Sequence, residues 1–286
     1  MLFENASAEI ALLLFTLLVP AGITALAAMA CVRGFFPEAD EAAARKADRL
    51  TTLPAVVMLV GLVCSFFHLG SPGHVFNMFS GIGTSPLSNE IIVAAIAIVA
   101  GAVYWIICLV KGMPAATQKI CGIVLAILAL LCTVFTALAY SIPTIPTWNT
   151  PFSIVSQLGL ALLGGSALAA TSFAIAGYKL STQAALVLKV CGAVGLAGVA
   201  IDLVGQAAVS GAAVGSAGAM LASVMGDFAL VGIVCLVLCA VGYALWICGK
   251  GKAAPVCIGM ICVMVGLALM RVDFYGTFLS AGLAYL

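Results

Sequence analysis

The sequence predicts an all-α fold: a polytopic membrane protein built as a bundle of eight transmembrane helices with both termini outside. Of its 286 residues, 65% are hydrophobic and only 7% are charged. A soluble domain cannot keep that much apolar surface away from water, whereas a bilayer solvates it directly. The net charge of +1 says nothing about nucleic acid, because in a membrane protein the positions of the charges matter more than their sum. We expect no nucleic-acid partner for a protein of this class.

Apolar runs follow one another along the chain, and each approaches the roughly 20 residues that a bilayer core requires. We expect a single integral membrane domain over residues 1–286. Asp227 then begins the seventh helix, and the small apolar segment 209–222 fits either a re-entrant segment or an extension of a helix. The eight helices are expected at about 9–32, 50–69, 89–110, 118–141, 153–178, 184–208, 223–248 and 254–272.

Basic residues orient this bundle, because 10 of the 11 fall on one side of it. The positive-inside rule makes that side cytoplasmic, so the predicted location is the cell inner (cytoplasmic) membrane. Glu4 and Glu9 precede the first apolar run without a basic residue, so we interpret this run as an anchor and not as a cleavable signal. The polar segment 33–50 places acidic residues before basic ones, which suits a short interfacial helix in a solvated connector. The ten residues are Arg33, Arg45, Lys46, Arg49, Lys111, Lys119, Lys179, Lys189, Lys250 and Lys252.

Redox centres are not expected in this protein. The 11 cysteines form no CxxC pair and lie almost entirely in apolar runs, so we interpret them as small buried hydrophobes and predict no metal site and no iron–sulfur cluster. A bis-histidine haem needs histidines on facing helices, and the only two, His68 and His74, share one loop. Any electrons must therefore come from a diffusible carrier in the lipid and pass to centres in partner proteins.

The polar interval 64–90 holds both histidines and ends at Glu90. His68 would lie at the outer end of the second helix and Glu90 at the outer start of the third, so an imidazole and a carboxyl group flank one loop. Such a pair suits a site that takes protons from a small organic donor. The structural alternatives are an interfacial histidine bonded to a backbone carbonyl, and a helix cap formed by Glu90 with Ser88 and Asn89.

Other charged residues inside the spans are costly in hydrocarbon and are therefore paired or functional. Asp202 and Gln206 share one helix face, which fits a polar clamp between helices. Arg271 has two candidate partners, Asp273 on its own helix and Glu90 across the bundle.

Several segments together resemble the membrane-anchor subunit of the anaerobic dimethyl sulfoxide reductase family, over nearly the whole sequence. They are HLGSP from His68, Phe76-Asn77, SPLSNE ending at Glu90, PTIPTW ending at Trp148, and Arg271 with Phe274-Tyr275-Gly276. The resemblance implies an anchor without haem that binds menaquinol near the outer face and yields menaquinone. It also implies two partners on that face, an iron–sulfur electron-transfer subunit with four clusters and a molybdopterin catalytic subunit. The segment after Trp148, together with Asp202 and Asp273, departs from the family pattern.

The resemblance assigns His68 and Glu90 as the quinol-site histidine and carboxylate, and Arg271 as a basic residue near the last outer loop. A ring hydroxyl of the quinol would then hydrogen-bond to neutral His68 while Glu90 accepts the second proton. The cleft would lie at the outer ends of the second, third and eighth helices. Side chains expected to orient the quinol or to wall the cleft are Ser71, Asn77, Asn89, Tyr140, Trp148 and Tyr275.

Three alternatives stay open. A proton-coupled secondary transporter would use the intramembrane Asp202, but it predicts related sequence halves, which this protein lacks. A structural anchor would hold reductase subunits without touching quinol. An anchor related to polysulfide reductase would also be haem-free and quinone-linked, but would lack the combination of HLGSP and SPLSNE.

Overall fold

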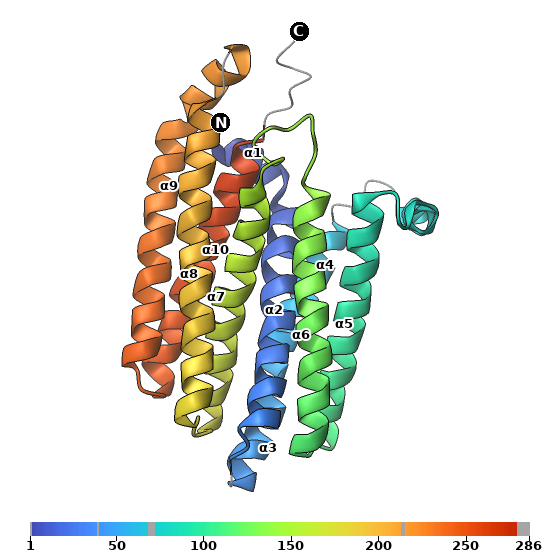
Figure 1. The fold of residues 1–286 in the computed structure, drawn as a ribbon, viewed down its shortest axis with the longest axis vertical. Helices are drawn as coiled ribbons and strands as arrows, with labels where there is room; N and C mark the ends of the chain where they lie inside the picture. The colour runs from blue at the N-terminus through green and yellow to red at the C-terminus, as the bar shows by residue number, and fades with distance from the viewer. Residues whose placement is uncertain (1, 39, 68–71, 213–214, 279–286) are drawn as a thin grey trace.

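The computed structural model describes residues 2–38, 40–67, 72–212 and 215–278. Throughout these ranges the regular secondary structure is helical, and eight helices are long and apolar enough to cross a membrane, as predicted (Figure 1). The second of these spans runs through two consecutive helices, α3 and α4. The eight spans comprise α2 (Ile10–Phe35), α3 and α4 (Glu41–Leu50 and Thr52–Phe66), α5 (Pro86–Val110), α6 (Ala115–Ala139), α7 (Pro151–Ala176), α8 (Thr182–Gly211), α9 (Gly215–Cys248) and α10 (Ala253–Gly276).

Two helices were not expected from the sequence. The short helix α1 (Leu2–Ala8) lies against the end of α10, where the Asn5 side-chain amide donates to the Gly276 carbonyl oxygen at 3.1 Å. The 3-10 helix η1 (Pro72–Gly81) lies between α4 and α5 and projects from the side of the bundle (Figure 1).

The helix α3 confirms that the segment 33–50 contains a short helix, and its interfacial position stays a prediction. The segment is also more than a solvated connector. Asp40 caps α3 by accepting from the backbone N–H groups of Ala42 and Ala43 at 2.9 and 3.2 Å. Farther along α3, Asp48 is buried, and its Oδ1 accepts a hydrogen bond from Arg33 Nε at 3.0 Å. This ion pair ties α3 to the end of α2.

The segment 209–222 is a helix extension within its described residues, because α8 continues to Gly211 and α9 begins at Gly215. The seventh helix therefore begins before the predicted residue 223, although its membrane-spanning part, Leu221–Cys248, agrees with the prediction. Asp227 lies well inside α9 and is exposed, and it does not begin the helix. No proline interrupts the small apolar residues before it, so they continue the helix.

The helices α2 and α7 form the centre of the bundle. In their most apolar stretches 67% and 78% of the residues are buried, against 28–39% in the other six spans. One core joins α2 and α7 to α8, α9 and α10, and a second joins α2 to α4, α5 and α6. Because α2 contributes to both cores, it holds the two halves of the bundle together.

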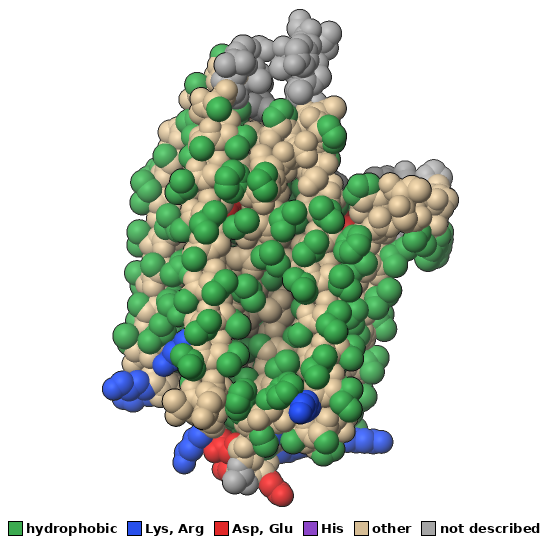
Figure 2. All heavy atoms as spheres, viewed as in Figure 1, with side chains coloured by type: hydrophobic (Ala, Val, Ile, Leu, Met, Phe, Trp, Pro, Cys, Tyr) green, Lys and Arg blue, Asp and Glu red, His purple; other side chains and the backbone are tan. Residues whose placement is uncertain are grey.

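Charge separates the two ends of the bundle. Figure 2 shows Lys and Arg side chains gathered at the lower end and hydrophobic side chains along the sides. The lower end carries α3 and the links α5–α6, α7–α8 and α9–α10, while α1 and the end of α10 lie at the opposite end (Figure 1). The one-sided placement of the basic residues is confirmed, and the assignment of that side to the cytoplasm stays a prediction.

Candidate functional site

Glu90 is a buried carboxyl group near the beginning of α5. The cap of this helix is Ser85, whose Oγ accepts from the backbone N–H of Ser88 at 3.4 Å, so Glu90 is not the helix cap. Its side chain points into the bundle and is only 4% exposed, and its Oε1 has no hydrogen-bond partner among the described residues. A buried acceptor without a donor is costly, so such a group calls for a ligand, a water molecule or a proton.

Two groups from other helices interact with this carboxyl. The hydroxyl of Thr136 on α6 and the guanidinium of Arg271 on α10 are its polar neighbours. Thr136 is 1% exposed, and its Oγ1 also has no hydrogen-bond partner in the described part of the sequence. The interior between α5, α6 and α10 therefore holds polar atoms with unused hydrogen-bonding capacity.

Arg271 is the most deeply buried cation of this interior, with 1% of its surface exposed. Its Nε donates to Thr16 Oγ1 at 3.2 Å, and its guanidinium lies 4.1 Å from the ring centroid of Phe274. The nitrogens Nη1 and Nη2 have no hydrogen-bond partner within the described ranges. These two nitrogens remain available to donate to an oxygen that enters the bundle.

Of the two partners expected for Arg271, the structure favours Glu90. Residues two apart on a helix point in different directions, and both carboxylate oxygens of Asp273 lack a hydrogen-bond partner in the described segments. The predicted alternative of a pair between Arg271 and Asp273 is therefore wrong. Arg271 instead interacts electrostatically with Glu90 on α5 and with Asp202 on α8.

A layer of aromatic rings supports Arg271 at the end of the bundle. The Tyr275 hydroxyl donates to the Tyr140 hydroxyl at 2.6 Å, and the Trp148 indole N–H donates to the Phe274 carbonyl oxygen at 2.8 Å. The rings of Trp148 and Phe274 stack with their centroids 5.2 Å apart. Tyr140, Trp148 and Tyr275 thus pack on one another at this end of the bundle, and their role as walls of a cleft stays a prediction.

Asp202 and Gln206 are both buried on α8, as expected for residues that share a helix face. The expected clamp is incomplete, because Asp202 Oδ1 and both amide atoms of Gln206 lack partners among the residues described. Asp202 lies close to Ser156 on α7 and to Arg271. Arg271 therefore interacts electrostatically with carboxyl groups of two other helices, α5 and α8, without forming an ion pair with either among the described residues.

Four predicted site residues are not part of this interior as the structure describes it. His68 and Ser71 fall outside the described residues. Asn77 is exposed on η1, and Asn89 Oδ1 accepts from the backbone N–H of Gly83 at 2.7 Å, so Asn89 organises the loop before α5. Two of the cavities lie away from Glu90, one at the basic end of the bundle and one as an apolar groove between α2, α6, α7 and α8.

Sequence reasoning missed Thr16, Thr136 and Gln157. Gln157 on α7 donates through Nε2 to the Thr16 carbonyl oxygen at 3.1 Å, which adds a third polar side chain to the surroundings of Arg271. The only sequence signal for these three residues was that each is a polar residue inside an apolar run. It does not by itself say which way the side chain points.

Comparison with known proteins agrees with this architecture. The family model described as DMSO reductase anchor subunit (DmsC) matches residues 3–277. The YnfH subunit of an anaerobic dimethyl sulfoxide reductase of Escherichia coli (strain K12) is 28% identical over 256 residues, which cover 88% of the present sequence and 89% of the relative. The C subunit of anaerobic dimethyl sulfoxide reductase from the same strain is 29% identical over 244 residues, covering 80% of the present sequence and 81% of the relative.

A third relative matches a shorter part of the sequence. The C subunit of anaerobic dimethyl sulfoxide reductase from Haemophilus influenzae is 34% identical over 106 residues, which cover 37% of the present sequence and 38% of that protein. The family match extends from α1 to the end of α10 and so includes all eight spans. The chain is a membrane-spanning member of the DMSO reductase anchor-subunit family.

Proposed function

We propose that this protein binds menaquinol at the end of the bundle opposite the basic residues, oxidises it, and passes the electrons to an iron–sulfur partner. The proposal rests on two buried groups that interact electrostatically: Glu90, whose Oε1 lacks a donor, and Arg271, whose Nη1 and Nη2 lack acceptors, among the described residues. A quinol hydroxyl donates a hydrogen bond, and the quinone oxygen formed from it accepts one. Glu90 and Arg271 supply the complementary groups for these two states.

The position of these groups suits a substrate that comes from the lipid. Glu90 lies close to the start of α5, next to η1, whose Phe76 and Phe79 are 72% and 55% exposed. Leu87 in the first turn of α5 is 59% exposed and extends this apolar surface. Glu90 itself is only 4% exposed. The quinol ring can therefore reach it only if neighbouring segments shift, and η1, which projects from the bundle beside the start of α5, is the candidate for that movement (Figure 1).

Oxidation of menaquinol releases two electrons and two protons. His68, in the segment between α4 and η1, takes one proton, and Glu90 takes the other directly or through water. Arg271 stabilises the ionised Glu90 before the proton arrives and holds the ring oxygen afterwards. Both protons leave on the side of the membrane that carries α1.

The partners follow from the family. An iron–sulfur subunit with four clusters docks over the same end of the bundle, which keeps its nearest cluster close to the quinol site. A molybdopterin subunit behind it reduces the terminal acceptor, so the anchor performs quinol oxidation and no part of the terminal reduction. The positive-inside rule then places the assembly on the outer face of the cell inner membrane.

The assembled complex provides the test. We expect Glu90→Gln to lower menaquinol-driven reduction about 100-fold, within the range of about 10² to 10⁴ that a positioned acid or base contributes. Reduction driven by a soluble viologen dye, which delivers electrons to the partner subunits without quinol, should stay unchanged. Asp227→Asn is the matched control, because it removes an exposed carboxylate from α9.

A purely structural anchor predicts the opposite result. Quinol-driven turnover would then survive Glu90→Gln at the rate of Asp227→Asn, and the proposal would be wrong. Equal loss of quinol-driven and viologen-driven turnover would also contradict it, because it would assign Glu90 to assembly of the complex.

A further inference from the structure

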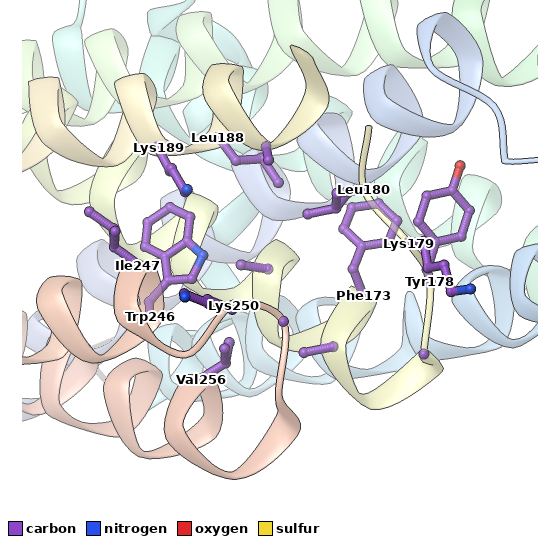
Figure 3. A pocket seen from close by; sticks show the side chains of 15 residues that line it. Phe173, Tyr178, Lys179, Leu180, Leu188, Lys189, Trp246, Ile247, Lys250 and Val256 are labelled. Carbon is purple, nitrogen blue, oxygen red and sulfur yellow. The ribbon is translucent and has the colours of Figure 1, made fainter. Parts of the chain in front are cut away.

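A second site lies at the basic end of the bundle, far from Glu90. The ends of α7, α8, α9 and α10 enclose a cavity of about 450 Å³ (Figure 3). Its floor is apolar and includes the buried side chains of Phe173, Leu188 and Val256. Three lysines line it, Lys179, Lys189 and Lys250. A cavity of this size is large enough for a small organic ligand.

The lysines give the cavity an excess of positive charge. None of the three lysines forms an ion pair with another described residue. The ion pair in the described part of the protein joins Arg33 to Asp48. The nearby acid is Glu38, which accepts from the backbone N–H of Lys179 at 2.5 Å and so offsets the charge at that end. Lys189 and Lys250 lie at the other end, and Figure 3 shows their amines on either side of the Trp246 ring.

Trp246 provides a hydrogen-bond donor between these two amines. Its ring is 7% exposed and is held edge-on by Tyr243, with centroids 5.4 Å apart. Gly192 allows this packing, because a Cβ there would lie 2.6 Å from the ring. The indole N–H donates to no described residue, and Figure 3 shows the indole nitrogen facing into the cavity. Tryptophan at the membrane interface commonly uses this N–H at the level of lipid headgroups.

The backbone brings Lys250 to the rim at some cost. Lys250 and Gly251 follow each other in the link between α9 and α10 with φ angles of 47° and 77°. A non-glycine residue rarely adopts this left-handed conformation. A lysine at this position keeps an ammonium group beside Trp246 where a glycine would relieve the backbone strain.

We propose that this cavity binds the phosphate headgroup of an anionic phospholipid from the leaflet at the basic end. The phosphate lies between the amines of Lys189 and Lys250 and accepts a hydrogen bond from the Trp246 indole. The acyl chains run along the bundle, where α8 and α9 present exposed aliphatic side chains such as Val190, Val194 and Val237. Basic pockets between helices on the cytoplasmic side are suited to such headgroups.

Lipid binding to the full-length protein in neutral detergent tests this site. The probes are phosphatidylglycerol, phosphatidylcholine and inorganic phosphate, with bound molecules counted by native mass spectrometry. We expect phosphatidylglycerol to bind in preference to the other two probes. The double variant Lys189→Gln/Lys250→Gln should weaken that binding at least about tenfold, because each basic residue near a membrane surface contributes about fivefold.

Two further variants sharpen the test. Lys111→Gln/Lys119→Gln removes the same charge from the same end of the bundle outside the cavity and should leave binding unchanged, while Trp246→Phe keeps the ring and should weaken binding severalfold. Equal binding of phosphatidylcholine would overturn the proposal. An equal loss of phosphatidylglycerol binding in both double lysine variants would also overturn it. Binding of inorganic phosphate as tight as that of the lipid would overturn it as well, because it would indicate a site for free anions.

Discussion

The buried pair of Asp48 and Arg33 allows a sharp test of how the basic end is held together. Asp48 Oδ1 accepts from Arg33 Nε and Gln118 Nε2, both at 3.0 Å. Its Oδ2 accepts from Arg33 Nη2 and from the Met113 backbone N–H, both at 3.3 Å. Asp48 and Arg33 are 3% and 7% exposed, so water compensates little when the pair is broken.

Asp48→Asn keeps one oxygen and replaces the other by an NH₂ group that faces two donors. Two hydrogen bonds to a charged group are lost, each contributing about 1.5–3 kcal/mol, and a buried guanidinium remains without its counter-charge. We expect the free energy of unfolding to fall by about 3–5 kcal/mol. The assay is reversible unfolding of the reconstituted protein by titration with a denaturing detergent.

Asp40→Asn is the matched control on the same helix. Asparagine caps a helix about as well as aspartate, so this variant should lie within about 0.5 kcal/mol of the wild type. A loss below about 1 kcal/mol for Asp48→Asn would refute the reasoning, because it would mean that the pair behaves as an exposed ion pair.

Three further variants test packing and helix termination. Gly195→Ala on α8 should lower the free energy of unfolding by at least about 1–3 kcal/mol, because its Cβ would lie 2.4 Å from a backbone nitrogen of α7; Gly226→Ala, with open space around it, should raise it by about 0.5–1 kcal/mol. Similar losses for both would contradict the packing described. Arg45 donates to the carbonyl oxygens of Leu109 and Val110 at 3.0 and 2.8 Å, so Arg45→Gln should speed amide hydrogen exchange at the end of α5, and unchanged exchange there would show that these bonds contribute nothing.

Length and hydropathy were enough to predict the eight spans, because a bilayer imposes one length on every helix. They were not enough to place the ends, because helices extend beyond the hydrocarbon. Residues 215–222 are helical, which is the helix extension that the sequence left open beside a re-entrant segment. The short helix α1 was missed because Leu2–Ala8 depends on its contact with α10.

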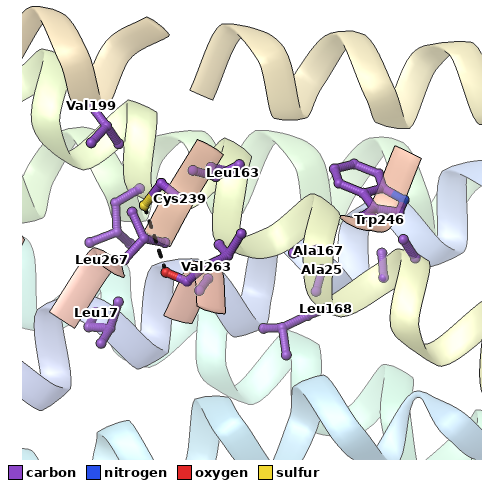
Figure 4. Packing of buried hydrophobic residues seen from close by; sticks show 14 of the residues in the cluster. Leu17, Ala25, Leu163, Ala167, Leu168, Val199, Cys239, Trp246, Val263 and Leu267 are labelled. Atoms are coloured by element: carbon purple, nitrogen blue, oxygen red, sulfur yellow. Dashed lines mark hydrogen bonds between the residues drawn. The ribbon is translucent and has the colours of Figure 1, made fainter. Parts of the chain in front are cut away.

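The expectation that the cysteines are buried hydrophobes holds for four of them, while six are partly exposed and Cys248 is exposed; the buried ones are Cys108, Cys132, Cys235 and Cys239. Cys239 is fully buried among Leu163, Val263 and Leu267 (Figure 4). Its thiol donates a weak hydrogen bond to the Val263 carbonyl oxygen at 3.9 Å. Composition predicted this environment because cysteine behaves as a small hydrophobe inside apolar helices.

The candidate site was predicted only in part. A charge inside an apolar run is costly, and this reasoning identified Glu90, Asp202 and Arg271. The rotation of each helix about its axis decides which of these groups meet, and sequence periodicity is weak when a helix is apolar on all sides. For that reason the contact of Arg271 with Thr16, and the position of Thr136 beside Glu90, required the structure.

Photo-crosslinking with an azido-menaquinone analogue is the most direct test of the quinol site. The proposal predicts labelled peptides from the segment between α4 and α5, from the first turns of α5, or from the last turns of α10 around Arg271. Labelling confined to the apolar groove between α2, α6, α7 and α8, or to the cavity at the basic end, would contradict it.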